Sequence, residues 1–198
     1  MSNETIQTIY ERRAIRKYKD QPVERKLIEE IIEAGKMAPS AVNEQPWKFY
    51  VVTDKKEIKH LSNQIAVASA KKMAKAGLKK IVKSAASFIH SPHDLSFLKE
   101  GDFIFHGAPV VVFLTSPKDK EWAALDIGMC SQNMMLAAKS LGIDSCPVGL
   151  AKFIEGTKAY LLLNLPETDH VNLAIIFGYG DESAEVKERK SNNVFFIN

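Results

Sequence analysis

The stretch PVVVFLT, residues 109–115, is a continuous apolar run with the length of one β-strand. A run without alternating polar residues is typical of a strand that is covered on both faces, so we predict a central strand here. The run NLAIIF, residues 172–177, predicts a second buried strand for the same reason. A third strand is expected in WKFYVVT, residues 47–53, because aromatic and β-branched residues favour strands.

Apolar residues at helical spacing predict helices around these strands, over residues 4–12, 24–37, 55–62, 65–89 and 126–141. Pro39 should end the second of these helices and Gly142 the last. Because the helices and strands do not alternate regularly, we expect an α+β fold with a mixed or largely antiparallel sheet. The chain has neither a GxGxxG nor a GxxxxGK[ST] motif, so a nicotinamide Rossmann domain is not expected.

The length of 198 residues and the mass of 22.1 kDa predict a single domain, residues 1–198. Hydrophobic residues make up 45% and charged residues 26%, which excludes a disordered chain. No apolar run approaches the roughly 20 residues of a membrane span, and residues 1–10 lack the core of a signal peptide. Two cysteines are too few for a disulfide framework. We therefore expect a cytoplasmic protein that is not associated with a membrane.

The net charge of +3 hides a basic stretch over residues 55–83. That stretch contains one acid, Glu57, and many lysines, of which four recur every four residues: Lys71, Lys75, Lys79 and Lys83. Such a stripe can attract nucleic acid or an anionic lipid surface. It lacks interleaved aromatic residues for base stacking and opposing Trp or Phe residues for lipid insertion. Binding to nucleic acid or to a membrane is therefore kept only as an alternative hypothesis.

Two basic clusters lie near the two ends of the chain. Arg12, Arg13, Arg16 and Lys17 follow the first predicted helix, and Lys187, Arg189 and Lys190 follow the last predicted strand. Arginines offer forked donors that suit a phosphate, although such residues can equally form a solvated surface. The two clusters would make one phosphate site if the chain ends meet in space.

A stiff polar loop, APSAVNEQPWKF, occupies residues 38–49. Its prolines restrict the backbone, and between them Ser40, Asn43 and Gln45 carry short polar side chains. Those groups could orient a planar heterocycle with ring carbonyls and nitrogens. They could equally cap the backbone of their own loop. Both interpretations remain open.

The segment DIGMCSQNMMLAAKSLGIDSCPVGL, residues 126–150, predicts an apolar helix, a turn and a short extended run. Gln132 and Asn133 would each need a partner if they are buried in that helix. Pro147 and Gly149 allow backbone N–H groups to point into a site. Cys146 has no neighbouring base in the sequence, so a catalytic cysteine is not expected.

The histidines do not form a metal-binding pattern. His90 and His93 are close in sequence, but Pro92 lies between them and no cysteine or carboxylate cluster completes a ligand set. We expect no metal site.

Taken together, four segments resemble the nitroreductase family of flavin-dependent oxidoreductases. They are ERRAIRKY (11–18), APSAVNEQPWKF (38–49), DIGMCSQNMMLAAKSLGIDSCPVGL (126–150), and FGYG with the downstream ERK (177–190). The segments keep the order of the family and span nearly the whole chain, whereas residues 64–105 match nothing in it. That region is expected to be a variable lid that shapes the substrate pocket.

The resemblance implies a nitroreductase-like fold and a homodimer with FMN at the subunit interface. The C-terminal strand, within NNVFFIN, would be exchanged between subunits. The phosphate and ribityl chain would be held by Arg12, Arg13, Arg16, Lys187 and Arg189, and Ala14 replaces the family's usual polar residue. The flavin would be contacted by the loop residues Pro39, Ser40, Asn43 and Gln45, and by the backbone of Pro147, Val148, Gly149 and Leu150.

The resemblance also implies the reaction. NADH or NADPH would pass a hydride to flavin N5, and a nitroaromatic, quinone or similar electron-poor acceptor would then receive electrons in the same pocket, by ping-pong kinetics. No side chain is expected to act as an acid or a base. Alternatives on the same scaffold are reductive dehalogenation, dehydrogenation, flavin fragmentation, or flavin binding without turnover.

Overall fold

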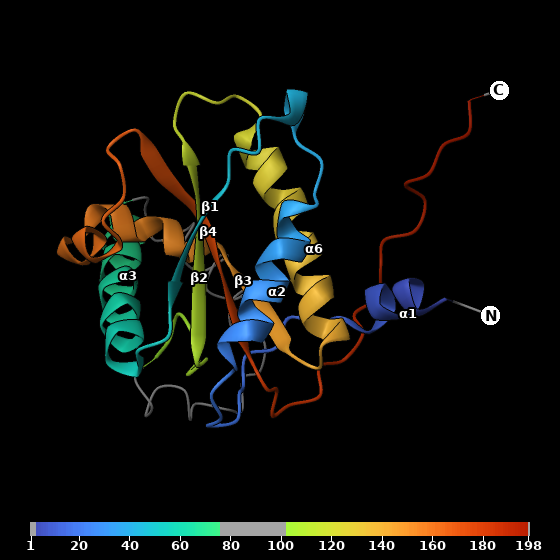
Figure 1. Cartoon of the computed structure of the whole chain (residues 1–198), viewed down its shortest axis with the longest axis horizontal. Coiled ribbons are helices and arrows are strands. Elements are labelled where there is room, and N and C mark those ends of the chain that lie inside the picture. The colour runs from blue at the N-terminus through green and yellow to red at the C-terminus, as the bar shows by residue number, and fades with distance from the viewer. Residues whose placement is uncertain (1–2, 76–101, 198) are drawn as a thin grey trace.

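The computed structural model describes residues 3–75 and 102–197. Within them, the strands form one antiparallel sheet in the order β1-β2-β4-β3 (Figure 1). Its strands are β1 (Lys48–Val52), β2 (Val110–Pro117), β3 (Asp144–Val148) and β4 (Asp169–Gly178). Residues 110–116 of β2 are all buried, which confirms the predicted central strand. The antiparallel pairing confirms the expected α+β class with a largely antiparallel sheet.

Helices cover both faces of this sheet, because alternate residues of its buried strands point to opposite sides. On one face, α2 (Arg25–Lys36) and α6 (Ala123–Ser140) pack over Val112 and Ile175. On the other face, α3 (Lys55–Lys75) and the 3-10 helices η2 (Gly149–Gly156) and η3 (Lys158–Leu163) pack over Phe113 and Ile176. Figure 1 shows the resulting three layers, with the sheet in the middle.

The helices α2 and α6 approach closely at Gly35. A Cβ atom at this position would lie 2.5 Å from Cγ of Met134, a distance that real Cβ contacts do not show. Glycine is therefore required here by the packing of the two helices rather than by a turn.

Two of the predicted helices are a single helix. The sequence predicts one helix over residues 55–62 and another from residue 65, but α3 continues without a break from Lys55 to Lys75. No glycine or proline interrupts this stretch, and the buried residues Ile58, Leu61 and Ile65 keep one helical face against the sheet. The predicted continuation to residue 89, together with Lys79, Lys83 and most of the predicted variable region 64–105, lies outside the described residues.

Two boundaries also extend further than predicted. The last long helix begins at Ala123 instead of residue 126, and β4 begins at Asp169 instead of residue 172. Asp169 lengthens β4 because it pairs with Pro117 across the sheet, and its carboxylate accepts a hydrogen bond from Lys48 Nζ at 2.8 Å. The helices predicted over residues 4–12 and 24–37 are confirmed as α1 (Glu4–Glu11) and α2.

Both ends of the chain lie beside β3 and the end of β4. After α1, Ala14 forms a bridge with Ser145, and Tyr18 forms one with Gly180. Beyond β4, the chain runs past α1 as a tail that extends from the body of the molecule (Figure 1). Residues 194–197 form no strand in this part of the chain, and their exposed fractions range from 70% to 97%. The exchange of this segment between subunits therefore stays a prediction.

Candidate functional site

A cluster of arginines forms where the chain leaves α1. Arg12 is the C-cap of that helix, and Arg13 and Arg16 follow it on the segment that bridges to β3. Burial, then the neighbouring positive charges of Arg13 and Arg189, lower the pKa of Arg12 below its usual value. Within residues 3–75 and 102–197, no ion pair joins these four guanidinium groups to a carboxylate. The cluster is therefore a concentration of positive charge that an anion would stabilise.

Arg13 carries the most specific signal in this cluster. Its Nη1 donates a hydrogen bond to the carbonyl oxygen of Arg12 at 2.6 Å, but its buried Nε has no hydrogen-bond partner in the described part of the chain. A buried donor without a partner is costly, so an acceptor from outside the chain would stabilise Arg13. A phosphate fits, because it offers several acceptor oxygens and matches the fork of a guanidinium.

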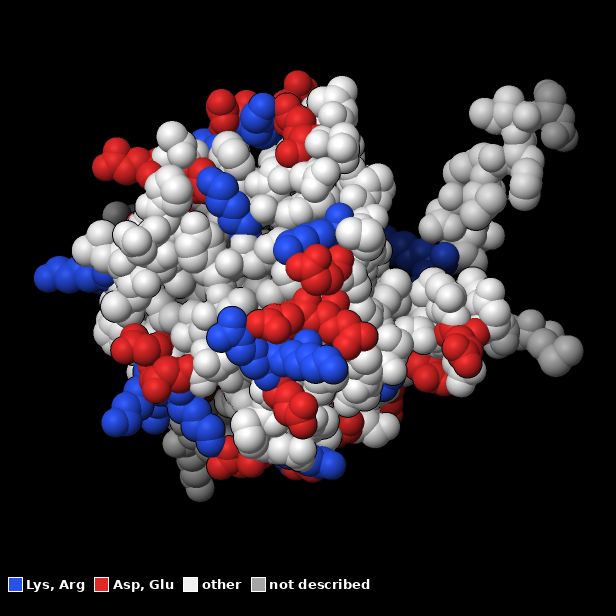
Figure 2. Space-filling model, in the orientation of Figure 1, with Lys and Arg blue, Asp and Glu red and all other residues white. Residues whose placement is uncertain are grey.

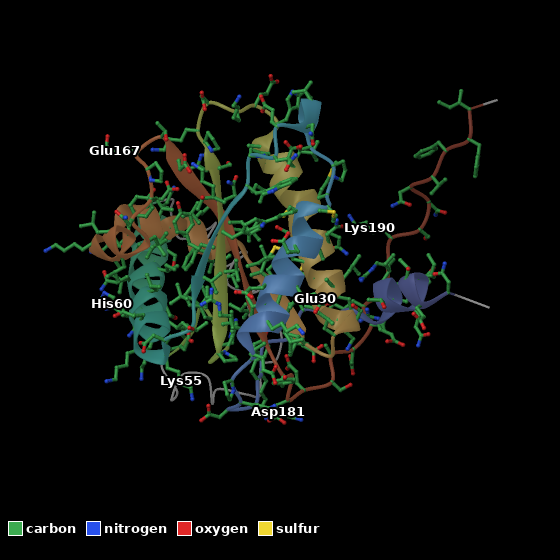
Figure 3. All side chains as sticks on the ribbon, viewed as in Figure 1. Glu30, Lys55, His60, Glu167, Asp181 and Lys190 are labelled. Carbon is green, nitrogen blue, oxygen red and sulfur yellow. The ribbon has the colours of Figure 1, made fainter. Side chains whose placement is uncertain are left out.

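The two ends of the chain meet at this cluster, as the sequence analysis required for a joint phosphate site. Lys19 N donates to the carbonyl oxygen of Tyr179 at 2.8 Å, and Asp181 N donates to that of Lys17 at 2.9 Å. From there the C-terminal segment passes α1, as the positions of Asp181 and Lys190 show in Figure 3. Arg189 is close enough to Arg12 for its positive charge to lower the pKa of Arg12. Its Nη1 donates a hydrogen bond to the carbonyl oxygen of Lys187 at 3.1 Å.

Strand β3 brings the turn after it next to the arginines. Ile15 N donates to the carbonyl oxygen of Ser145 at 3.1 Å, so the cluster lies alongside the start of the run from Cys146 to Leu150. Along that run, Pro147 and Gly149 are exposed, Leu150 is half-buried and Val148 is buried. A Cβ atom added to Gly149 would meet nothing within 4 Å, so there is open space beside this backbone.

Cys146 has the properties of a core residue rather than of a nucleophile. Its side chain is buried in the core on the α3 face of the sheet. Burial raises the pKa of its thiol, although Arg16 and Arg12 act in the opposite direction. A thiol with a raised pKa is protonated at neutral pH and is a poor nucleophile.

The polar loop that precedes β1 has an unusual backbone. Val42, Asn43 and Gln45 all have positive φ angles, of 45°, 57° and 49°. Ser40 Oγ accepts a hydrogen bond from Gln45 N at 3.0 Å, and Gln45 Nε2 donates to Asn43 Oδ1, also at 3.0 Å. The loop therefore satisfies part of its own hydrogen bonding, while Asn43 and Gln45 remain exposed and available for contacts.

In one chain, the polar loop and the arginine cluster lie at opposite ends of α6 (Figure 1). Ala41 N donates to Asp126 Oδ1, in the first turns of α6, at 3.2 Å. At the other end, Lys139 pairs with Asp144, the first residue of β3, at 3.4 Å. At 1.5 Å per residue, Asp126 and Lys139 are about 20 Å apart along the helix. The structure thus brings together the predicted residues of the N-terminal cluster, the C-terminal cluster and the turn after β3, but not those of the loop.

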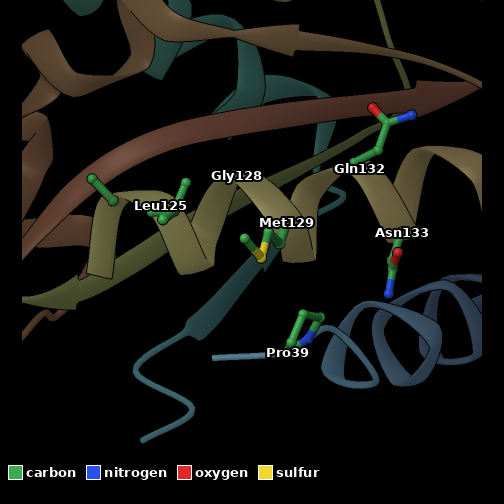
Figure 4. Close-up of a pocket in the computed structure, with 7 residues that line it drawn as sticks. Pro39, Leu125, Gly128, Met129, Gln132 and Asn133 are labelled. Carbon is green, nitrogen blue, oxygen red and sulfur yellow. The ribbon is translucent and has the colours of Figure 1, made fainter. Parts of the chain in front are cut away.

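An apolar groove runs along the face of α6 that points away from the sheet (Figure 4). Its volume is about 470 Å³, and it is lined by Pro39, Ala124, Leu125, Gly128, Met129, Gln132 and Asn133. Asn133 is half-buried in this apolar helix, and its side-chain amide has the hydrogen-bond partner that such a position requires: Nδ2 donates to the carbonyl oxygen of Ala34 at 3.4 Å. Gln132 is exposed on this face and does not depend on a protein partner.

The described residues give no support to a metal site or to a membrane span. They contain no group of three or more histidine, cysteine or acidic side chains that could hold a metal ion, and His90 and His93 lie outside them. No helix in the same ranges is long and apolar enough to cross a bilayer. On the face drawn in Figure 2, basic and acidic side chains intermingle. Ion pairs on α2 include Arg25–Glu29 and Lys36–Glu33.

The antiparallel α+β fold places an arginine cluster suited to a phosphate beside an open backbone turn. Comparison with known proteins makes this more specific. Residues 9–179 match the nitroreductase family, and the chain belongs to that family. It is a nitroreductase-type oxidoreductase.

Two curated relatives and one solved structure illustrate the similarity. The chain is 30% identical to a chloronitrobenzene nitroreductase of Comamonas testosteroni, over 94% of this chain and 91% of that protein. It is 29% identical to a 4-nitrobenzoate reductase of Pseudomonas putida, over 88% and 85%. The crystal structure of a nitroreductase with bound FMN from Bacteroides fragilis superposes with a TM-score of 0.76 over the whole of both chains, at 26% identity.

Sequence reasoning missed one buried polar residue of this region. The sequence pattern indicates Asp126 only as the beginning of an apolar helix, whereas in the structure its Oδ1 accepts a hydrogen bond from the backbone of the polar loop. An isolated acid at the start of an apolar helix was the signal that could have identified it.

Proposed function

We propose that this protein is an FMN-dependent oxidoreductase that takes a hydride from NADH or NADPH and reduces nitroaromatics, quinones or similar electron-poor acceptors. The observation that carries the proposal is the buried, unpartnered Nε of Arg13 in a cluster of four arginines. In the described part of the chain no carboxylate forms an ion pair with their guanidinium groups, and Glu182 meets the cluster through the backbone N of Arg16. Membership of the nitroreductase family supports the same cofactor and donors.

The arginine cluster would bind the phosphate end of FMN. Arg12, Arg13, Arg16 and Arg189, with Lys187, would surround the phosphate and the ribityl chain. Ala14 can contribute only its backbone to this contact, because its side chain has no polar atom. The positive charge of the cluster would also favour negative charge on the cofactor.

The turn after β3 would orient the flavin ring. Pro147, Val148, Gly149 and Leu150 present backbone beside an open space, and the side chain of Val148 points into the core instead. A ring could thus approach the backbone without meeting a side chain at Gly149. This surface would orient the ring for hydride transfer from the donor.

The polar loop would reach the same flavin from a second subunit. The polar loop and the arginine cluster of one chain lie at opposite ends of α6, and Asp126 and Lys139, near those ends, are about 20 Å apart along the helix. One flavin is therefore more readily contacted by the loop of another copy, through Pro39, Ser40, Asn43 and Gln45. A homodimer is further supported by exposed apolar residues on α1 and α6, namely Ile6, Ile9, Tyr10, Leu125 and Met129. The apolar tail, Val194–Ile197, would then be covered by the partner.

When bound, FMN supplies the chemistry itself, accepting a hydride and delivering reducing equivalents to the acceptor in a ping-pong reaction. The chain contributes binding and orientation. The nearby thiol of Cys146 is buried and protonated, so it is not expected to react.

The test is an absorption spectrum of the purified protein, followed by addition of NADH or NADPH without oxygen. We expect flavin bands that bleach with the reduced nucleotide and return when a nitroaromatic or a quinone is added. Bound flavin that stays oxidised would indicate another donor or a flavoprotein without turnover. A colourless protein that also fails to bind added FMN would overturn the proposal.

A further inference from the structure

Asp126 is the buried acid beside the polar loop. Only 3% of this residue is exposed, and apart from Ser131 the other buried residues of its helix are apolar. One carboxylate oxygen, Oδ1, accepts the hydrogen bond from Ala41 N at 3.2 Å, and the other, Oδ2, is buried without a partner in the described part of the chain. The residue is therefore held in an environment that penalises its charge.

Part of that penalty is offset by the position of Asp126 in α6. It lies in the first turns of the helix, where the helix dipole favours negative charge. The dipole does not satisfy Oδ2, however, and a small apolar residue would avoid the desolvation of a carboxylate altogether. An apolar residue could not accept the hydrogen bond from Ala41 N, so this bond is the contact that a carboxylate provides at position 126.

The loop that Ala41 belongs to needs to be held. Val42 has a φ angle of 45° and is 91% exposed, so a β-branched residue sits in the left-handed region without burying its side chain. Two contacts tie this loop to the rest of the chain near Val42: the hydrogen bond to Asp126, and an ion pair between Glu44 and Lys120 at 2.8 Å. Of these two, the ion pair is exposed and the bond to Asp126 is partly buried.

We propose that Asp126 is a positioning residue for the cofactor. It fastens the backbone of Ala41 and thereby fixes Ser40 and Asn43, on either side, in the geometry that contacts the flavin of the second subunit. This inference rests on the proposed function, because it assigns the loop a role in binding FMN.

Two substitutions remove the same hydrogen bond from its two ends. Ala41→Pro deletes the donor, and proline suits this position because Ser40 is extended (φ −138°, ψ 154°) and Ala41 is the first residue of η1 (Ala41–Asn43). Asp126→Ala deletes the acceptor. Asp54→Ala is the matched control, since it also removes a carboxylate that accepts backbone hydrogen bonds, from Lys56 N and Glu57 N at 2.9 Å, but at the start of α3.

The readouts are the dissociation constant of FMN, from the quenching of flavin fluorescence, and hydrogen exchange of the Ala41 amide in the cofactor-free protein. We expect each single variant to weaken FMN binding about tenfold, and the double variant to weaken it no more than the stronger single variant. The Ala41 amide should be protected in the wild type and exchange faster in Asp126→Ala. The control should bind FMN like the wild type.

If the wild type binds FMN and both Ala41→Pro and Asp126→Ala bind it equally well, the positioning role is wrong and the proposed function stands. Additive losses in the double variant would also overturn it, because the two residues would then act separately. If the wild type binds no FMN, the proposed function fails and this inference fails with it. Ala41→Pro keeps the test decisive if Asp126→Ala does not fold, because it leaves the core of α6 untouched.

Discussion

At the scale of single residues, Arg13 provides the most direct test of the phosphate site. Arg13→Gln should weaken FMN binding by about tenfold to a hundredfold, because it removes a charged donor from the ligand. The cofactor-free protein should lose little stability, because the substitution removes a local hydrogen bond from Nη1 to the carbonyl oxygen of Arg12 but also removes one repulsive charge from the cluster. Flavin titration and thermal unfolding of the apoprotein check the two parts.

The control for this variant is Arg25→Gln. Arg25 is an exposed arginine that pairs with Glu29 on α2, away from the cluster. It should leave FMN binding unchanged. Equal FMN affinity in Arg13→Gln and in the wild type would contradict the assignment of Arg13 to the phosphate.

Gly149 tests whether the open space beside β3 is used. Gly149→Val should fold, because an added Cβ meets nothing within 4 Å in the described chain, but it should weaken FMN binding at least tenfold by occupying the space of the ring. Gly156→Val is the matched control: Gly156 lies in the same 3-10 helix and also has open space. If the two variants bind FMN alike, the flavin does not lie against Gly149.

At the scale of elements, Gly35 determines how closely α2 and α6 pack. Gly35→Ala should lower the free energy of unfolding by about 1–3 kcal/mol, since its Cβ would lie 2.5 Å from Met134 Cγ. Helix propensity alone predicts the opposite sign, with alanine favoured by roughly 0.5–1 kcal/mol. Urea unfolding measures the change, and Ala34→Gly calibrates the propensity at the neighbouring position. A more stable Gly35→Ala would show that α6 can yield at Met134.

At the scale of the whole molecule, stability should decline at alkaline pH. Burial raises the pKa of Cys130 to about 12 from an ordinary value of 9.0, and burial also raises the pKa values of Cys146 and Tyr18. As the pH rises, the unfolded chain would release these protons before the folded chain does. The contribution of these groups to the free energy of unfolding is therefore fully present below about pH 9 and is lost as the pH rises further. Urea unfolding at several pH values should show the decline, with a shallower slope in Cys130→Ala. A slope unchanged by that substitution would exclude Cys130 as a contributor.

The C-terminal tail bears on the assembly of the molecule. A chain that ends after Lys190 keeps Lys187 and Arg189 but loses the exposed apolar residues Val194–Ile197. If this segment packs on a second subunit, the shortened chain should dissociate at higher protein concentration than the full chain in sedimentation experiments. Identical dissociation of the two chains would argue that the tail plays no part in a dimer.

The sequence alone determined the parts of this protein that depend on local pattern. The apolar runs at residues 109–115 and 172–177 predicted the central strands, because a strand buried on both faces has no polar alternation. Helical spacing predicted α1, α2 and most of α6. The prediction of two helices, over residues 55–62 and 65–89, is wrong for α3, which continues from Lys55 to Lys75 with no glycine or proline to break it.

Only the tertiary structure decided which of the distant residues meet. The pairing of Lys19 with Tyr179 brings both basic clusters to β3, and the length of α6 keeps the polar loop about 20 Å from them. It also showed that Arg13 has an unpartnered buried nitrogen and that Asp126 holds Ala41. Burial and hydrogen-bond satisfaction arise from contacts between segments far apart in the chain, so no local pattern in the sequence records them.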